Sequence, residues 1–218
     1  MVAPSARPAL VKPRMRGVLH QWAFFVSLIL GLVLVLAANG GRETFAASVY
    51  AGSVAALLGT SALYHRVNWS RTAARLWMRR LDHAMIFVLI AGTYTPFGLL
   101  VLEGTLATAI LIAVWSGAVA GIVLQLVWVQ APKWVSALVY VALGWVAVLT
   151  FPGLIDGIGV FGTLLVAAGG LLYTVGAVVY ALGRPDPAPT VFGYHEIFHA
   201  LVIVAAALQY AAIAFYVV

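Results

Sequence analysis

Long apolar runs recur along this 218-residue chain, and they constrain its fold more than any other feature. Seven of them are separated by short polar segments, at residues 22–38, 44–64, 81–102, 106–129, 134–151, 158–182 and 194–217. About 20 apolar residues suffice to span a bilayer as a helix. A helix pairs its own backbone groups, whereas an open strand edge in lipid leaves them unpaired. The sequence therefore predicts an all-α, polytopic membrane protein, a bundle of seven transmembrane helices.

The composition excludes the soluble classes of protein. Hydrophobic residues make up 64% of the chain and charged residues 8%, against about 45–50% and about 25% in soluble domains. A net charge of +6 would suggest a nucleic-acid partner in a soluble protein. Here the basic residues are confined to the segments between the apolar runs. We therefore expect these basic residues to contact the lipid bilayer, and we expect no nucleic-acid partner.

The basic residues also predict an orientation. Eleven of the twelve Lys and Arg residues lie in the N-terminal segment and in every second connecting segment after it: Arg7, Lys12, Arg14, Arg16, Arg66, Arg71, Arg75, Arg79, Arg80, Lys133 and Arg184. The connecting segments on the opposite side of the membrane contain only Arg42 among basic residues. Because cytoplasmic loops carry the excess of Lys and Arg, the N-terminus is predicted to be cytoplasmic and the C-terminus outside. The chain then divides into a basic segment at 1–20 and a transmembrane domain at 21–218. A cleaved signal peptide is the alternative for the first run, although its apolar stretch is long for one.

Ionisable side chains at membrane depth are costly, and they are functional candidates for that reason. His195 and His199 are four residues apart and share one helix face. Their run matches H-E-x-x-H, in which two histidines bind zinc. The predicted topology places His65 and Asp82 at the same depth, near the inner leaflet. Since the chain has no cysteine, three neutral imidazoles with an open position predict a catalytic type of zinc site.

Two neighbouring residues complete the candidate site. Ser61 lies four residues before His65 on the same helix face, where it can hydrogen-bond a metal-bound water, a substrate or its own helix backbone. Asp82 can orient the bound water. Its alternatives are to cap its helix or to pair with Arg79 or Arg80.

The remaining polar residues receive structural interpretations. Glu196 lies about 100° around the helix from His195, so it need not point at the metal. We expect His83 to be structural, and His20 to lie at the membrane interface with no further role. The Gly117-x-x-x-Gly121 spacing permits close helix packing, either inside the bundle or in a homodimer.

Four motifs in this order resemble the bacterial hemolysin III proteins, which belong with the adiponectin and progestin receptors to the PAQR family. They are Ser61-Ala62-Leu63-Tyr64-His65, Leu81-Asp82-His83-Ala84-Met85-Ile86, Ala91-Gly92-Thr93-Tyr94-Thr95-Pro96 and His195-Glu196-Ile197-Phe198-His199. The resemblance covers residues 18–217. It implies seven helices with a cytoplasmic N-terminus and a zinc ion held by His65, His195 and His199. It also assigns Asp82 and Ser61 to the site.

The related alkaline ceramidases use the same constellation to hydrolyse a lipid amide. The resemblance therefore implies a zinc-dependent hydrolase of a lipid amide or ester in a bacterial inner (plasma) membrane, with a membrane lipid or lipid-like substrate. Asp82 would move the proton of the attacking water, and Ser61 would hold the developing oxyanion. Three other interpretations remain: a non-enzymatic membrane-homeostasis or sensor protein with structural zinc, a pore-forming hemolysin, and a proton-coupled transporter without metal.

Overall fold

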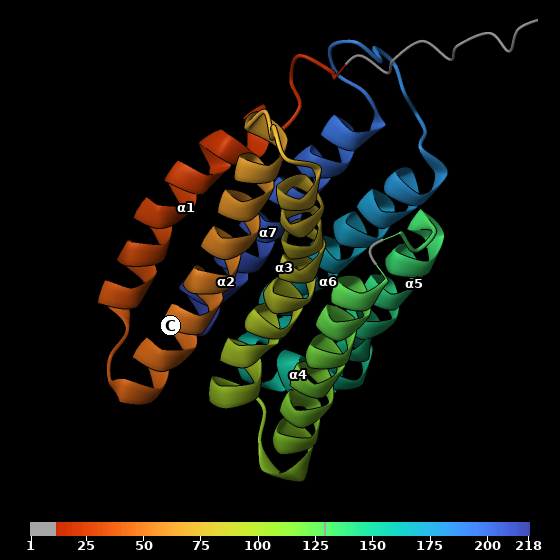
Figure 1. The fold of residues 1–218 in the computed structure, drawn as a ribbon. Coiled ribbons are helices and arrows are strands. Elements are labelled where there is room, and N and C mark those ends of the chain that lie inside the picture. Colours follow the sequence, from red (N-terminus) through yellow and green to blue (C-terminus); the bar gives the residue numbers. More distant parts are fainter. Residues whose placement is uncertain (1–11, 129) are drawn as a thin grey trace, which may run out of the picture.

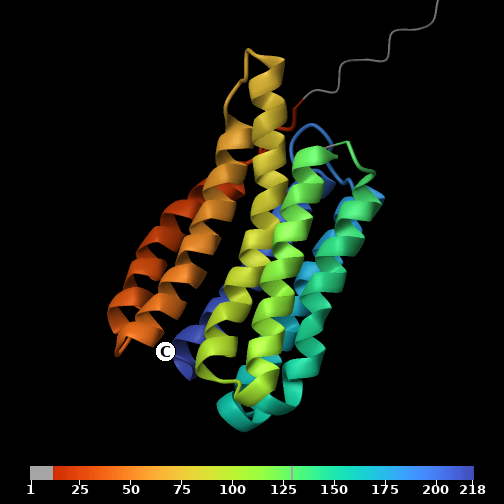
Figure 2. The ribbon, with the colours of Figure 1, turned by 60° about the horizontal axis from the view of Figure 1, so that its bottom comes forward.

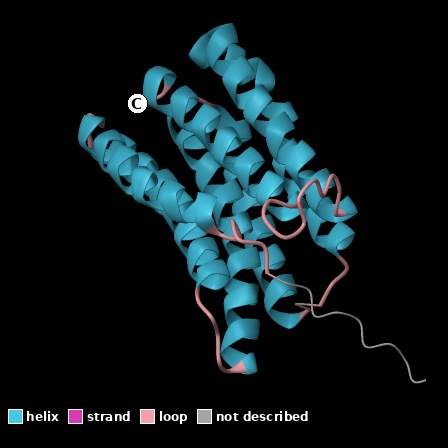
Figure 3. Cartoon of the chain, turned by 90° about the horizontal axis from the view of Figure 1, so that it is seen from above, coloured by secondary structure: helices cyan, strands magenta, loops and turns pink. Residues whose placement is uncertain are grey.

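The computed structural model describes residues 12–128 and 130–218, which fold into a bundle of helices joined by loops (Figures 1 and 3). Arg7, most of the predicted segment 1–20 and the predicted end of the fourth run at Val129 lie outside the described residues. The elements are α1 (Val18–Ala37), α2 (Gly41–Arg66), α3 (Thr72–Leu100), α4 (Gly104–Val127), α5 (Lys133–Gly144), the 3-10 helix η1 (Trp145–Thr150), α6 (Phe151–Leu182) and α7 (Tyr194–Tyr216). The all-α prediction is confirmed.

Six helical segments of the described part are long and apolar enough to cross a membrane. One is the continuous run Lys133–Leu182, which has 50 residues and includes α5, η1 and α6. A hydrogen bond shows that this run folds back on itself: the indole N–H of Trp145 donates to Oγ1 of Thr174, 29 residues later, at 3.0 Å. A straight helix would separate these residues by about 43 Å. The chain therefore reverses within this run, where Gly159 interrupts the helical backbone of α6, and α5 and α6 pack side by side.

Several helix bounds differ from the apolar runs for physical reasons. Helix α3 begins at Thr72 rather than near residue 81, and it extends past its neighbours (Figure 2). Its first turns are rich in Ala, Leu, Met and Arg, which have high helix propensity. The arginines interrupt the apolar run there, so apolarity alone does not mark these turns as part of the helix. Helix α6 begins at Phe151 rather than near residue 158. Pro152 is tolerated in its first turn. The non-helical backbone of Gly159, with φ 71°, divides α6 into two helical pieces, and the second begins close to the predicted start.

The interior of the bundle gathers helices that are distant in sequence. One core cluster joins α1, α2, α3, α4, α6 and α7 around buried residues that include Tyr50, Phe97, Leu154 and Ile213. Large apolar side chains also cover the outer surface, among them Leu36, Phe161 and Phe215. An apolar exterior of this extent is expected of a surface that faces lipid.

The two glycines of the Gly117-x-x-x-Gly121 motif both face neighbouring helices of the same bundle. A Cβ on Gly117 would lie 2.6 Å from the side chain of Leu143 in α5. A Cβ on Gly121 would lie 2.2 Å from the ring of Phe87, a fully buried residue of α3. The motif therefore lets α4 approach α3 and α5 closely.

We expect Gly121→Ala to destabilise the protein by about 1–3 kcal/mol, the usual cost of overpacking a filled core. The matched control is Gly170→Ala in α6, where an added Cβ meets nothing within 4 Å. Thermal unfolding in detergent measures both variants. Equal melting temperatures for the two would contradict this account of the α3–α4 contact.

Candidate metal centre

Three histidines meet inside one end of the bundle. His65 lies in the last turn of α2, and His195 and His199 lie in the first turns of α7. Figure 1 shows that α2 ends and α7 begins at this same end. One ligand atom from each histidine lies within 4.8 Å of those of the other two, and no other such group of His, Asp or Glu occurs in the described part of the chain.

The spacing of these nitrogens fits a metal ion. The Nε2 atoms of His65 and His195 are 3.1 Å apart. Two nitrogens that each lie about 2.0–2.1 Å from a tetrahedral zinc are separated by about 3.3 Å. His65 and His199 are buried, and His195 is half-buried. Imidazole nitrogens suit zinc and other first-row metals, so the three residues can hold such an ion.

The structure also brings Asp82 and Ser61 to this centre. Asp82 Oδ2 lies 3.7 Å from His65 Nε2. That distance is too long for a direct hydrogen bond, and it leaves the carboxyl group beside the imidazole cluster. Ser61 is buried one turn before His65. Asp82, Ser61, His195 and His199 line one cavity, so the predicted candidate residues gather in one place.

The expectation that His20 lies at the interface without a further role is wrong. His20 is buried with 2% of its surface exposed. Its Nδ1 shares a hydrogen bond of 2.8 Å with Ser61 Oγ, and its ring stacks on His199 with centroids 3.7 Å apart. Because α1 begins at Val18 rather than near residue 22, His20 belongs to the first helical turn and faces inward.

Glu196 turns away from the imidazoles. Its Oε2 accepts a hydrogen bond of 2.9 Å from the backbone N–H of Gly193 and so caps α7. Its Oε1 accepts the Nε–H of Arg16 in an ion pair. The glutamate is fully buried, whereas the arginine side chain is 22% exposed. The match to H-E-x-x-H therefore does not give this glutamate a place beside the metal.

The segment before α1 lies against the site. The backbone N–H groups of Arg14 and Met15 donate to the carbonyls of Thr190 and Val191 at 3.0 and 3.1 Å. Gly17 follows with φ 79°, and a Cβ there would lie 2.6 Å from that of His65. Only glycine combines this left-handed backbone with so close an approach. The Arg16–Glu196 pair thus ties this segment to α7 directly over the imidazole cluster.

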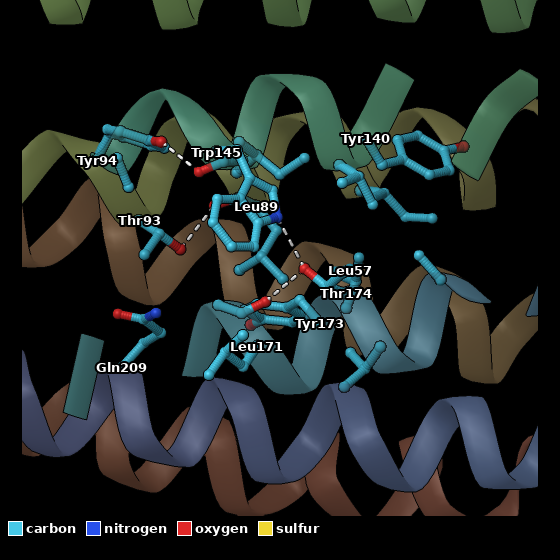
Figure 4. A pocket seen from close by; sticks show the side chains of 18 of the residues that line it. Leu57, Leu89, Thr93, Tyr94, Tyr140, Trp145, Leu171, Tyr173, Thr174 and Gln209 are labelled. Carbon is cyan, nitrogen blue, oxygen red and sulfur yellow. Dashed lines mark hydrogen bonds between the residues drawn. The ribbon is translucent and has the colours of Figure 1, made fainter. Parts of the chain in front are cut away.

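A cavity of about 290 Å³ extends from the metal centre into the bundle. His83 lines its outer part, and its backbone carbonyl accepts a hydrogen bond of 3.3 Å from Tyr140. Further along, the walls come from α2, α3, α5, η1, α6 and α7 and are mostly apolar, with Leu57, Leu89 and Leu171 among them (Figure 4). This shape suits an extended apolar ligand with one reactive group at the imidazole cluster.

We expect His195→Ala and His199→Ala to lower metal affinity by more than the 10–100-fold that loss of a supporting residue costs. His83→Ala is the matched control, because His83 lines the same cavity outside the three-histidine cluster. Elemental analysis of purified protein after dialysis against graded chelator gives the affinities. An equal loss in all three variants would contradict the ligand set.

Arg16→Met should destabilise the protein by about 3 kcal/mol, because it leaves the carboxylate of Glu196 as a buried charge without its partner. Arg16→Met combined with Glu196→Gln should recover part of that loss, since the uncompensated charge is gone. Thermal unfolding of the single and double variants measures the coupling. Strictly additive losses would show that the two side chains do not interact.

Comparisons with known proteins agree with these observations. A family model described as Haemolysin-III related matches residues 9–210. The Hemolysin-3 homolog of Bacillus subtilis (strain 168) is 33% identical over 188 residues, which cover 85% of this chain and 84% of the relative. Hemolysin-3 of Bacillus cereus is 32% identical over 204 residues, with 92% and 90% covered.

A more distant relative is the Monocyte to macrophage differentiation factor of Homo sapiens. It is 27% identical over 174 residues, which cover 78% of this chain and 70% of the relative. The match to the family model runs through α1 to α6 and most of α7, so it includes every residue of the imidazole cluster. The chain is a multi-pass membrane protein, and it belongs to the Haemolysin-III related family.

Proposed function

We propose that this protein is a zinc-dependent hydrolase that cleaves an amide or ester bond of a membrane lipid. The observation that carries the proposal is the buried imidazole cluster at one end of a long apolar cavity. A lipid can place its carbonyl at the cluster and its acyl chain along the cavity. The bound lipid would then exclude bulk water from the cavity, which strengthens the electrostatic interactions inside it.

The proposal includes seven membrane crossings with a cytoplasmic N-terminus in a bacterial plasma membrane. The reversal of the chain within Lys133–Leu182 supports two crossings in this run. The distribution of basic residues supports the orientation. The metal centre then lies near the cytoplasmic face, where lipid head groups and water are within reach.

Each residue of the site has a chemical part in this mechanism. His65, His195 and His199 would hold the zinc as neutral donors, and the chemistry it would supply there is polarisation of the lipid carbonyl and activation of a water at neutral pH. Asp82, beside the cluster, accepts the proton of the attacking water and returns it to the leaving group. Ser61 donates a hydrogen bond from its hydroxyl group to the developing oxyanion.

The tautomer of His20 determines whether the Ser61 hydroxyl can donate a hydrogen bond to the oxyanion. If Nδ1–H of His20 donates to Ser61 Oγ, the hydroxyl proton of Ser61 is free for the substrate. In the opposite tautomer, Nδ1 of His20 accepts the hydrogen bond from the Ser61 hydroxyl, which is then not available to the substrate. The stack of His20 on His199 holds the ring in the orientation that this hydrogen bond requires.

The second candidate function is a non-enzymatic membrane-homeostasis or sensor protein with structural zinc. It is favoured by the origin of the ligands, because one ion would join the end of α2 to the start of α7. Under this alternative, metal removal unfolds the bundle. A catalytic zinc leaves most of the bundle intact, since the α2–α3 and α6–α7 contacts do not depend on it.

We expect Asp82→Asn to slow lipid hydrolysis by 10²–10⁴-fold, the usual contribution of a general acid–base group, with metal content unchanged. Asp156→Asn is the control, because Asp156 is exposed and does not line the cavity. Release of fatty acid from a panel of ceramides and phospholipids by purified protein measures the rate. Zinc-loaded wild type that releases no fatty acid from the panel would overturn the proposal.

A further inference from the structure

The cavity has a second polar region at its inner end. His199 and Gln209 both line the cavity and lie ten residues apart on α7, which places Gln209 about 15 Å further along the helix. Tyr173 of α6 lines the same cavity and packs against the cluster that includes Leu57, Leu89 and Val202. Figure 4 shows Gln209 and Tyr173 among the side chains that surround this space.

Most polar side chains around them are already paired. Thr93 Oγ1 donates to the carbonyl of Leu89 at 2.8 Å, and the hydroxyl of Tyr94 donates to that of Gly144 at 2.7 Å. The indole N–H of Trp145 donates to Thr174. These hydrogen bonds, drawn as dashed lines in Figure 4, already use the donors of Thr93, Tyr94 and Trp145.

Gln209 and Tyr173 differ from these neighbours. Gln209 Oε1 and the hydroxyl oxygen of Tyr173 are both buried, and neither has a hydrogen-bond partner among the described residues. Leaving a buried polar group unpaired costs about 1–3 kcal/mol, and an apolar side chain would avoid this cost. Native proteins keep such groups where a ligand or a bound water completes them.

The position of the Gln209 amide is fixed by its surroundings. Its Nε2 donates to the carbonyl of Val166 at 3.1 Å, so Oε1 is the free acceptor. A Cβ on Gly169 would lie 2.8 Å from that Nε2 and 3.2 Å from the carbonyl of Ala205. Gly169 therefore makes room for the amide. Tyr173 lies one turn further along the same face of α6.

We propose that this inner end is a binding site for a hydroxyl group carried in the middle of a lipid acyl chain. A hydroxyl donates one hydrogen bond and accepts others, so it can donate to Gln209 Oε1 and accept from the hydroxyl of Tyr173. The inference rests on the proposed function, in which the cavity holds the acyl chain and the carbonyl lies at the metal centre. It adds a preference among chains that are otherwise equally apolar.

Equilibrium binding to purified, delipidated protein tests the proposal. The probes are stearic acid and a set of monohydroxystearic acids that carry the hydroxyl at successive positions. We expect mid-chain isomers to bind about tenfold more tightly than stearic acid, as one or two net hydrogen bonds would give. Isomers with the hydroxyl next to the carboxyl group should show no such gain.

Two conservative variants assign the preference to the site. Gln209→Leu and Tyr173→Phe should each reduce the ratio of the two affinities toward one. Gln125→Leu is the matched control and should keep the ratio, because Gln125 is buried, bonds to Ser136 and does not line the cavity.

Equal affinity for all isomers in the wild type would overturn the hydroxyl site and leave the proposed hydrolase standing. A preference that survives in both variants would overturn the assignment to Gln209 and Tyr173. Failure of every fatty acid to bind would overturn the lipid-filled cavity itself, and the proposed function with it.

Discussion

The rest of the site depends on the burial of three imidazoles within 4.8 Å of one another. Buried polar groups are costly without partners. Nε2 of His65 and Nε2 of His195 lie 3.1 Å apart, and one hydrogen bond between these two atoms leaves the facing nitrogen of the third histidine without a partner in the cluster. A bound cation would resolve this conflict and would fix the end of α2 against the start of α7. Asp82, Ser61 and His20 are arranged around that junction.

The first turn of α7 serves several purposes at once. It presents His195 and His199 on one face, while Glu196 between them caps the helix and binds Arg16. The segment before α1 is thereby held over the cluster, and Gly17 allows it to approach His65. A motif that elsewhere places a glutamate at the metal here uses it to close the site from outside.

The apolar runs and the spacing of the histidines suffice to predict the all-α bundle and the imidazole cluster. Apolar runs give the helices, the four-residue spacing puts His195 and His199 on one face, and the topology brings His65 to the same depth. The role of His20 could not be found in this way, because apolarity marks the lipid-spanning part of a helix and not its first turn. The Arg16–Glu196 pair joins residues 180 positions apart, and no local pattern encodes that contact. The reversal after α5 was predicted, but the 3-10 geometry of η1 carries no such signal.

Anomalous diffraction at the zinc absorption edge, measured on crystals of the purified protein, tests the central claim most directly. The account predicts one zinc peak per chain, about 2.0–2.1 Å from a nitrogen of each of His65, His195 and His199. A structure without a metal peak among these three nitrogens, or with zinc bound elsewhere, would contradict it.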